Sequence, residues 1–190
     1  MAFAPFDRFD WLLENLLVFL FVGIGLTTYR AFKLSDLSYA LIILFLAFHA
    51  YGAHYTYAET PFGFWLGDRF DLERNHYDRI VHFLFGLLIF YPAREAVMRG
   101  LGIVGFWGYC LGFLIANSFS HIYEIVEWLA AEILDPGEAL AFLGSQGDVF
   151  DAQKDIVLAM IGALIGWFLT VTAKTIVRRR SVLRETDGGR

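Results

Sequence analysis

Cysteine is nearly absent from this chain: Cys110 is the single cysteine among 190 residues, and it lies inside an apolar run. A disulfide within the chain is therefore excluded, and so is a metal site built from several thiolates. Charge is sparse as well, because Asp, Glu, Lys and Arg make up only 18% of the residues. The net charge of -5 and the lack of any basic motif argue against nucleic acid as a partner.

The beginning of the sequence lacks the features of a cleavable signal peptide. Residues 1–10 have no basic start, and no small-residue cleavage site follows the first apolar run. We therefore expect this run to be kept as a helix. Internal repeats and low-complexity segments are also absent from the sequence.

What the chain has in excess is apolar residues. They make up 57% of the sequence, and the mean hydropathy is +0.53, whereas soluble domains contain about 45–50%. A membrane span needs roughly 20 residues. The sequence predicts an all-α membrane protein with one domain over residues 1–190, folded as a five-helix transmembrane bundle. The expected spans cover residues 11–29, 37–53, 77–98, 101–134 and 154–177.

The positions of lysine and arginine predict the orientation of these spans. Basic residues follow the first, third and fifth spans, and cytoplasmic segments of membrane proteins are enriched in them. The N-terminus is therefore expected outside and the C-terminus in the cytoplasm. The basic residues are Arg30, Lys33, Arg94, Arg99, Lys174, Arg178, Arg179, Arg180 and Arg184.

This topology would bring histidines and acids from four helices to one outer layer. Asp148, Asp151 and Asp155 are three and four residues apart, so on a helix they share one face. Capping of the helix N-terminus explains Asp148 or Asp151. It does not explain Asp155, which is followed directly by Ile-Val-Leu.

Asp78 and His82 are four residues apart and form a second candidate pair. A carboxylate and an imidazole on one helix face are suitable ligands for Zn, Fe or Mn. The alternative is a hydrogen bond that ties the helix end to a neighbour. Arg79 is adjacent and could neutralise one of the surrounding acids.

A third group follows on the next helix, where His121, Glu124 and Glu127 are three residues apart. Di-metal carboxylate proteins use this spacing in the order Glu-x-x-His, which is reversed here. The alternative places Glu127 in water and bonds His121 to a backbone carbonyl. His49 and His54 lie about 140° apart around their helix, so one at most is expected to be a ligand, and His54 is favoured.

Unpaired, so many acids at one level of a membrane would be costly. We expect that divalent metal, rather than another side chain, faces them. Mixed carboxylate and imidazole ligation favours Zn, Mn or Fe over Mg or Ca, with one or two ions. The candidate metal ligands are Asp78, His82, Glu124, Asp148, Asp155, His54 and His121, and the candidate general bases are Glu127 and Asp151.

Several strings in these regions resemble the YjdF-like family of bacterial inner-membrane proteins. They are His76-Tyr77-Asp78-Arg79, His82-Phe83, Tyr123-Glu124 to Glu127-Trp128, Leu143-Gly144-Ser145-Gln146-Gly147-Asp148, Asp151-Ala152-Gln153 and Asp155. The resemblance implies a small polytopic protein of the bacterial inner membrane, and it supplies no reaction. It makes the acids within these strings and His82 positions of the family type, whereas His49 and His121 lie outside the strings.

The leading hypothesis is a metal-dependent, hydrolase-like enzyme that acts on a lipid or lipid-linked substrate at the outer interface, with membrane lipids as surroundings. A di-iron redox enzyme would use the same ligands. A transporter for a divalent cation or protons is the alternative from another class, and a structural ion-pair or metal cluster is the third. The sequence also allows a homo-oligomer. Residues 59–75 could form a lid over the site or a re-entrant segment at the interface.

Overall fold

The computed structural model describes residues 3–134 and 143–188, and every regular element in these ranges is a helix. Four of the helices are long and apolar enough to cross a membrane: α1, α2, α4, and α7 over Asp151–Val177. The described helices are α1 (Arg8–Thr28), α2 (Asp36–His54), α3 (Pro61–Phe70), α4 (Tyr77–Leu101), α5 (Gly105–Ile133) and α7 (Asp151–Gly188). The predicted all-α membrane fold is thereby confirmed.

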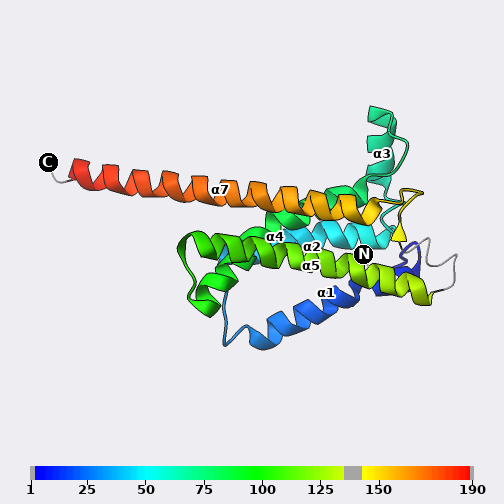
Figure 1. The fold of residues 1–190 in the computed structure, drawn as a ribbon, viewed down its shortest axis with the longest axis horizontal. Helices are drawn as coiled ribbons and strands as arrows, with labels where there is room; N and C mark the ends of the chain where they lie inside the picture. Colours follow the sequence, from blue (N-terminus) through cyan, green and yellow to red (C-terminus); the bar gives the residue numbers. More distant parts are fainter. Residues whose placement is uncertain (1–2, 135–142, 189–190) are drawn as a thin grey trace.

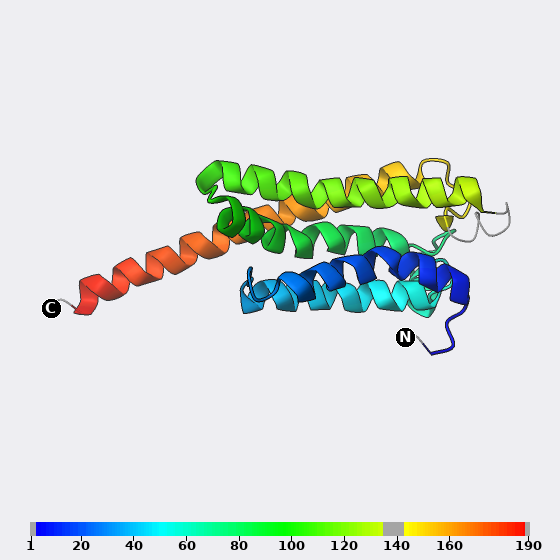
Figure 2. The ribbon, with the colours of Figure 1, turned by 90° about the horizontal axis from the view of Figure 1, so that it is seen from below.

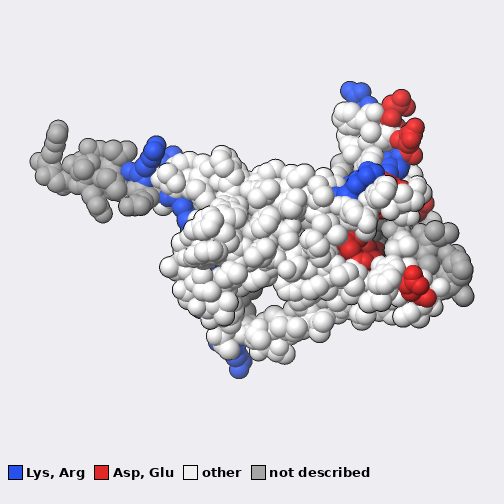
Figure 3. Space-filling model, viewed as in Figure 1, with Lys and Arg blue, Asp and Glu red and all other residues white. Residues whose placement is uncertain are grey.

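The long helices lie side by side, with α4 in contact with α2, α5 and α7 (Figures 1 and 2). At one end of the bundle α4 and α7 begin and α5 ends; we call it the acidic end. The opposite end carries a group of exposed cations without neighbouring acids in view (Figure 3) and is called the basic end. Figure 1 shows that α1 begins at the acidic end and that α7 extends well past the basic end. The cations of the basic end are Arg30, Lys33, Arg99, Lys174, Arg179 and Arg180.

Small residues explain why α4 and α7 pack so closely. A Cβ atom on Gly86 would overlap with the carbonyl oxygen of Ala159, and one on Gly162 would overlap with that of Phe83. Membrane helices lack a hydrophobic drive to associate, so close backbone packing is a main source of their affinity. The two helices that carry Asp78 and Asp155 are therefore held at a fixed register.

α4 continues through Pro92 and ends only at Leu101. Gly102 then adopts a left-handed conformation with φ +68°, a common way to end a helix. The sequence prediction ended this span near residue 98 and began the next at 101, whereas α5 starts at Gly105. The glycine turn between α4 and α5 accounts for the difference.

The start of α2 is fixed to the end of α4 by Glu95. Its carboxylate accepts hydrogen bonds from the Ser35 backbone N–H (3.0 Å) and from the hydroxyls of Ser35 (2.7 Å) and Ser38. Arg99 lies 3.2 Å from the same carboxylate. This network satisfies donors at a helix N-terminus, which would otherwise lack partners.

The sequence analysis left residues 59–75 open between a lid and a re-entrant segment, and it missed α3. Pro61 starts this short helix, and Asp71 ends it with a left-handed φ of 53°. Asn75 holds its base, because the Asn75 side chain accepts from the Thr60 hydroxyl (3.1 Å) and donates to the Thr60 carbonyl (3.0 Å). Figure 1 shows α3 projecting sideways from the acidic end, not folding over it. Its exposed aromatic residues are Phe62, Phe64, Trp65 and Phe70.

Candidate functional site

A layer of buried polar side chains crosses the bundle at the acidic end. Figure 3 shows acids and basic residues gathered there, while the face of the bundle in view is almost free of charge between the two ends. Five helices contribute to the layer, since it contains residues of α1, α2, α4, α5 and α7. Its buried members are Asp10, Glu14, His49, His82, Glu124, Asp151 and Asp155.

Three aspartates of α4 and α7 form the centre of this layer. One carboxylate oxygen from each of Asp78, Asp151 and Asp155 lies within 4.8 Å of the others. Asp151 and Asp155 are one turn apart on α7, and α4 brings Asp78 to the same level. Asp155 is only 2% exposed, and its Oδ1 atom accepts no hydrogen bond. These distances are suitable for oxygen ligands around one cation.

Asp78 also borders a second group. The Nε2 atom of His82 lies 3.5 Å from Asp78 Oδ1 and 3.2 Å from Glu124 Oε1. His82 and Glu124 are both buried, and Glu124 Oε1 accepts no hydrogen bond. The predicted pair of Asp78 and His82 thus meets α5, with Asp78 between the aspartates and the His82–Glu124 pair.

Two arginines face the outer aspartates of the layer. Arg74 donates to both oxygens of Asp151, at 2.6 and 3.2 Å, and Arg79 donates to Asp151 (3.1 Å) and Asp148 (2.5 Å). The expectation that no side chain would face the aspartates is therefore wrong for Asp148 and Asp151. Arg74 was missed because it lies in the segment before α4, where periodicity does not predict direction. Asp155 forms no ion pair with any side chain that the structure describes.

At the rim of the layer, the pKa values of Asp148 and His76 are shifted by their neighbours. Asp148 precedes α7, and His76 precedes α4. The Lys154 ammonium, 2.5 Å away, the Phe150 backbone N–H and Arg79 hold the pKa of Asp148 well below its usual value. Burial and the charges of the neighbouring arginines lower the pKa of His76. Asp148 is therefore a firmly ionised partner of side-chain cations, and His76 stays neutral at pH 7.

α1 adds two acids that the sequence analysis did not include. Glu14 is buried and accepts a hydrogen bond from the hydroxyl of Tyr123 on α5. Asp10 is 6% exposed, and neither of its carboxylate oxygens has a hydrogen-bond partner. The signal was present, because Asp10 and Glu14 are four residues apart at the start of a long apolar run, as Asp151 and Asp155 are.

On α2 it is His49, and not the favoured His54, that enters the layer. His49 is buried and its Nδ1 atom lies 2.5 Å from the hydroxyl of Tyr57, while its Nε2 atom has no partner. The His54 ring instead packs edge-on against Tyr55, with ring centroids 4.6 Å apart. Helical spacing excluded a shared face for the two histidines, but it could not show which face turns inward.

His121 and Glu127 have different surroundings on α5. His121 is exposed, and its Nδ1 atom lies 2.7 Å from the Asn117 carbonyl oxygen, one turn earlier. This is the alternative arrangement considered from the sequence. Glu127 is half-buried and interacts electrostatically with Glu124 and Glu14. His121 and His54 are thus not part of the group formed by Asp78, Asp151 and Asp155. Glu127 lies next to this group, one turn beyond Glu124.

The chemistry of this arrangement follows from its unpartnered atoms. Burying a carboxylate oxygen without a partner costs several kcal/mol, on the order of 1–3 for each neutral polar group and more for a charged one. Cations or protons must therefore offset the acids that the arginines do not reach. The atoms concerned are Asp155 Oδ1, Glu124 Oε1 and both carboxylate oxygens of Asp10.

Comparisons with known proteins agree with this architecture. The sequence profile of the family described as "Predicted membrane protein (DUF2238)" matches residues 1–175. The chain is similar to "Inner membrane protein YjdF" of Escherichia coli (strain K12), with 39% identity over 161 residues, 83% of this chain and 76% of that protein. No solved structure matches. The resemblance drawn from the sequence is confirmed, as is the bacterial inner membrane as the location.

Proposed function

This chain belongs to the DUF2238 family of predicted membrane proteins, and we propose that it binds a divalent cation in the buried acidic layer and acts as a metal-dependent hydrolase. The observation that carries the proposal is the group of Asp78, Asp151 and Asp155 beside the His82–Glu124 pair. In this group Asp155 Oδ1 is buried without a hydrogen-bond partner, and Glu124 Oε1 accepts no hydrogen bond although His82 lies 3.2 Å away.

The proposal includes five membrane spans. α5 has 29 residues, about 43 Å at 1.5 Å per residue, and runs beside α4 and α7. The hydrocarbon core is about 30 Å thick. With α5 as a span, the acidic end faces outward and the basic end faces the cytoplasm, which agrees with the distribution of lysine and arginine. The acidic layer then lies near the outer interface, where lipid headgroups can reach it.

The donor set suggests which metal would bind. Asp78, Asp155 and Glu124 offer carboxylate oxygens, and His82 offers an imidazole nitrogen. Such mixed ligation favours Zn, Mn or Fe over Mg or Ca. Because Asp78 lies between the two groups, it could bridge a pair of ions, as carboxylates do in two-metal sites. Asp148 drops out of the proposed ligand set, since Arg79 and Lys154 already bind its carboxylate.

A divalent cation held by Asp78, Asp155, Glu124 and His82 would lower the pKa of a bound water to about 7 and so supply a nucleophile for an ester or phosphoester. Of the two general bases considered, Glu127 is favoured over Asp151, because Arg74 and Arg79 occupy the Asp151 carboxylate. Glu127 is on α5 one turn beyond Glu124 and is half-buried. The substrate class is a lipid or a lipid-linked headgroup that enters from the outer leaflet.

Proton or cation transfer is the second candidate, and one observation favours it. Below Glu124, α5 places Asn117 and Ser120 in the interior, and Asn117 Oδ1 and Ser120 Oγ have no hydrogen-bond partner. Unsatisfied polar atoms deep in a membrane protein often mark a path for ions or water. A homo-oligomer could extend such a path.

Metal analysis of the purified protein tests the proposal. We expect close to one or two equivalents of Zn, Mn or Fe in the wild type and less than a tenth of that in Asp78→Ala and Asp155→Ala. Asp68→Ala, which removes an exposed acid of α3, is the matched control and should keep its metal. Sub-stoichiometric metal in the wild type contradicts the metal site.

Activity is tested separately with chromogenic esters and phosphodiesters in mixed micelles. We expect metal-dependent hydrolysis that Glu127→Gln reduces by about 10²–10⁴-fold without loss of metal. Metal-dependent flux in proteoliposomes, lost in Asp155→Ala but without any hydrolysis, would favour the transporter instead.

A further inference from the structure

Arg94 is a buried cation in the basic half of the bundle. Its side chain belongs to α4, the residue is only 4% exposed, and its Nε atom has no hydrogen-bond partner. The guanidinium carbon lies 3.9 Å from the centroid of the Tyr109 ring, a cation–π contact. No carboxylate among the described side chains, those of residues 3–134, 143–177, 179 and 180, forms an ion pair with Arg94.

A second cation approaches the same ring. Lys174 of α7 places its Nζ atom 5.7 Å from the Tyr109 centroid, and among the described residues it too lacks a carboxylate partner. Two positive charges at one half-buried ring repel each other, and of the two Arg94 is buried while Lys174 is exposed. Membrane proteins seldom keep such charges without a counter-charge, so this pair lacks an anion that the described chain does not provide.

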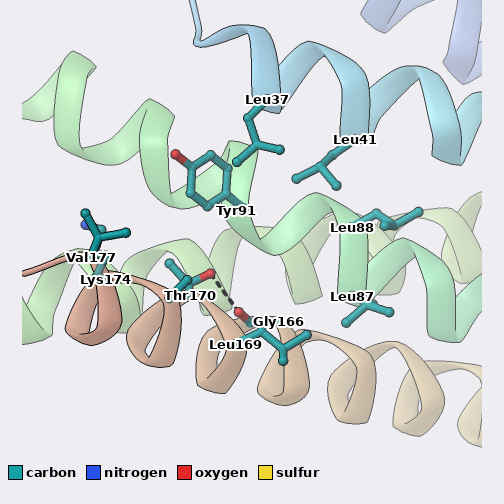
Figure 4. A pocket seen from close by; sticks show the side chains of 11 residues that line it. Leu37, Leu41, Leu87, Leu88, Tyr91, Gly166, Leu169, Thr170, Lys174 and Val177 are labelled. Carbon is teal, nitrogen blue, oxygen red and sulfur yellow. Dashed lines mark hydrogen bonds between the residues drawn. The ribbon is translucent and has the colours of Figure 1, made fainter. Parts of the chain in front are cut away.

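Lys174 also lines a groove between α2, α4 and α7. The groove has a volume of about 700 Å³ and a largely apolar wall, and Figure 4 shows its leucines facing the same space. Tyr91, Thr170 and Lys174 are its polar residues. The other lining side chains that carry the argument are Leu37, Leu41, Leu88 and Leu169.

The groove and the cation pair together define one ligand. We propose that the groove binds an acyl chain of an anionic phospholipid, and that the phosphate of this lipid lies at Lys174 and offsets the charge of Lys174 and Arg94. An uncharged acyl chain alone would account for the apolar wall of the groove but not for the two cations beside it. A free anion would explain the cations but not an apolar groove beside them.

A membrane lipid is favoured over a partner helix for two reasons. The groove is lined by α2, α4 and α7, three helices that are long and apolar enough to cross a membrane, so lipid would lie beside it. Its polar residues are confined to one end, as the polar part of a lipid is. Further exposed cations at this end, among them Arg99 and Arg179, raise the local concentration of anionic headgroups. The site is at the opposite end from the acidic layer and does not depend on metal binding.

Lipid titration of the full chain, followed by native mass spectrometry, tests the proposal. Phosphatidylglycerol and phosphatidylcholine with identical acyl chains are the two probes. We expect the wild type to bind phosphatidylglycerol about fivefold more tightly, because one lysine near a phosphate accounts for roughly that factor. Lys174→Gln should abolish the preference without preventing binding of either lipid.

A second variant addresses the groove itself. Ala173→Phe places a ring in the groove from an exposed position of α7. It should therefore lower the affinity for both lipids at least tenfold while the protein stays folded. Arg180→Gln and Leu164→Phe are the matched controls, since both residues are exposed on α7 outside the groove. Equal affinity of the wild type for the two lipids overturns the proposal, and so does a Lys174→Gln variant that keeps the preference.

Discussion

Replacing Asp155 by asparagine should have two opposite effects, and their combination distinguishes a ligand site from a structural ion-pair cluster. Asp155 is 2% exposed, its Oδ1 atom has no partner, and oxygens of Asp78 and Asp151 lie within 4.8 Å. An asparagine of the same shape removes one of three neighbouring acids. Its amide can also donate to the two that remain.

Without metal, the variant should therefore be more stable than the wild type. Relief of an unsatisfied buried group contributes about 1–3 kcal/mol. For a chain of this length that corresponds to about 2–12 °C in Tm. Metal acts in the opposite direction, because a cation at a hundred times its Kd stabilises only the protein that binds it, by about 2.7 kcal/mol.

The assay is thermal unfolding in detergent at a fixed heating rate, followed by tryptophan fluorescence, with EDTA or with added Zn or Mn. We expect metal to raise the Tm of the wild type by about 5–11 °C and to leave Asp155→Asn unchanged. Asp68→Asn, on the exposed surface of α3, should behave as the wild type in both conditions. The reasoning is refuted if Asp155→Asn is less stable than the wild type in EDTA or if it keeps the response to metal.

Three further predictions concern the scaffold and the rim of the site. Gly162→Ala should lower the free energy of unfolding by about 1–3 kcal/mol in chemical denaturation, because its Cβ would overlap with a carbonyl of α4. Gly23→Ala is the control: its Cβ meets nothing within 4 Å, so the substitution should be neutral or stabilising. Glu95→Ala should cost about 1–3 kcal/mol, because it leaves the N-terminus of α2 without its acceptor; an unchanged midpoint would mean that water replaces the carboxylate. Since the pKa of Asp148 is lowered in the folded state, its stabilisation is complete above about pH 4 and is lost as the pH falls further. Lys154→Gln should raise that pKa, so the acid-unfolding midpoint should move to higher pH, and a midpoint at lower pH would contradict the sign.

The sequence was sufficient to predict which helix faces are acidic. Asp78 with His82 and Asp151 with Asp155 are each four residues apart, so a helix places each pair on one side, and each pair is found together. Apolar composition predicts the long helices. Most of their ends differ from prediction by a few residues, because caps such as Gly102 act locally, whereas α7 continues beyond the predicted end at residue 177 to Gly188.

The sequence could not predict how each helix turns about its own axis. In a uniformly apolar run no periodicity marks the inner face, and for that reason His54 was favoured although His49 is the residue that enters the layer. The sequence also could not predict which side chains of non-helical segments bind the acids, as the hydrogen bond from Arg74 to Asp151 shows. Glu14 could have been predicted as a site residue, because burying its carboxylate at the start of an apolar helix costs free energy just as burying that of Asp155 does.

The close packing of α4 against α7 has a mechanical consequence. Because backbone meets backbone at Gly86 and Gly162, the two helices form one strut that joins the aspartates at one membrane surface to Lys174 near the other. α1 is attached differently, since only 17% of its apolar window is buried, against 50% in α4. The hydrogen bond from the Tyr123 hydroxyl to Glu14 therefore ties to α5 a helix that buries little of its own apolar surface.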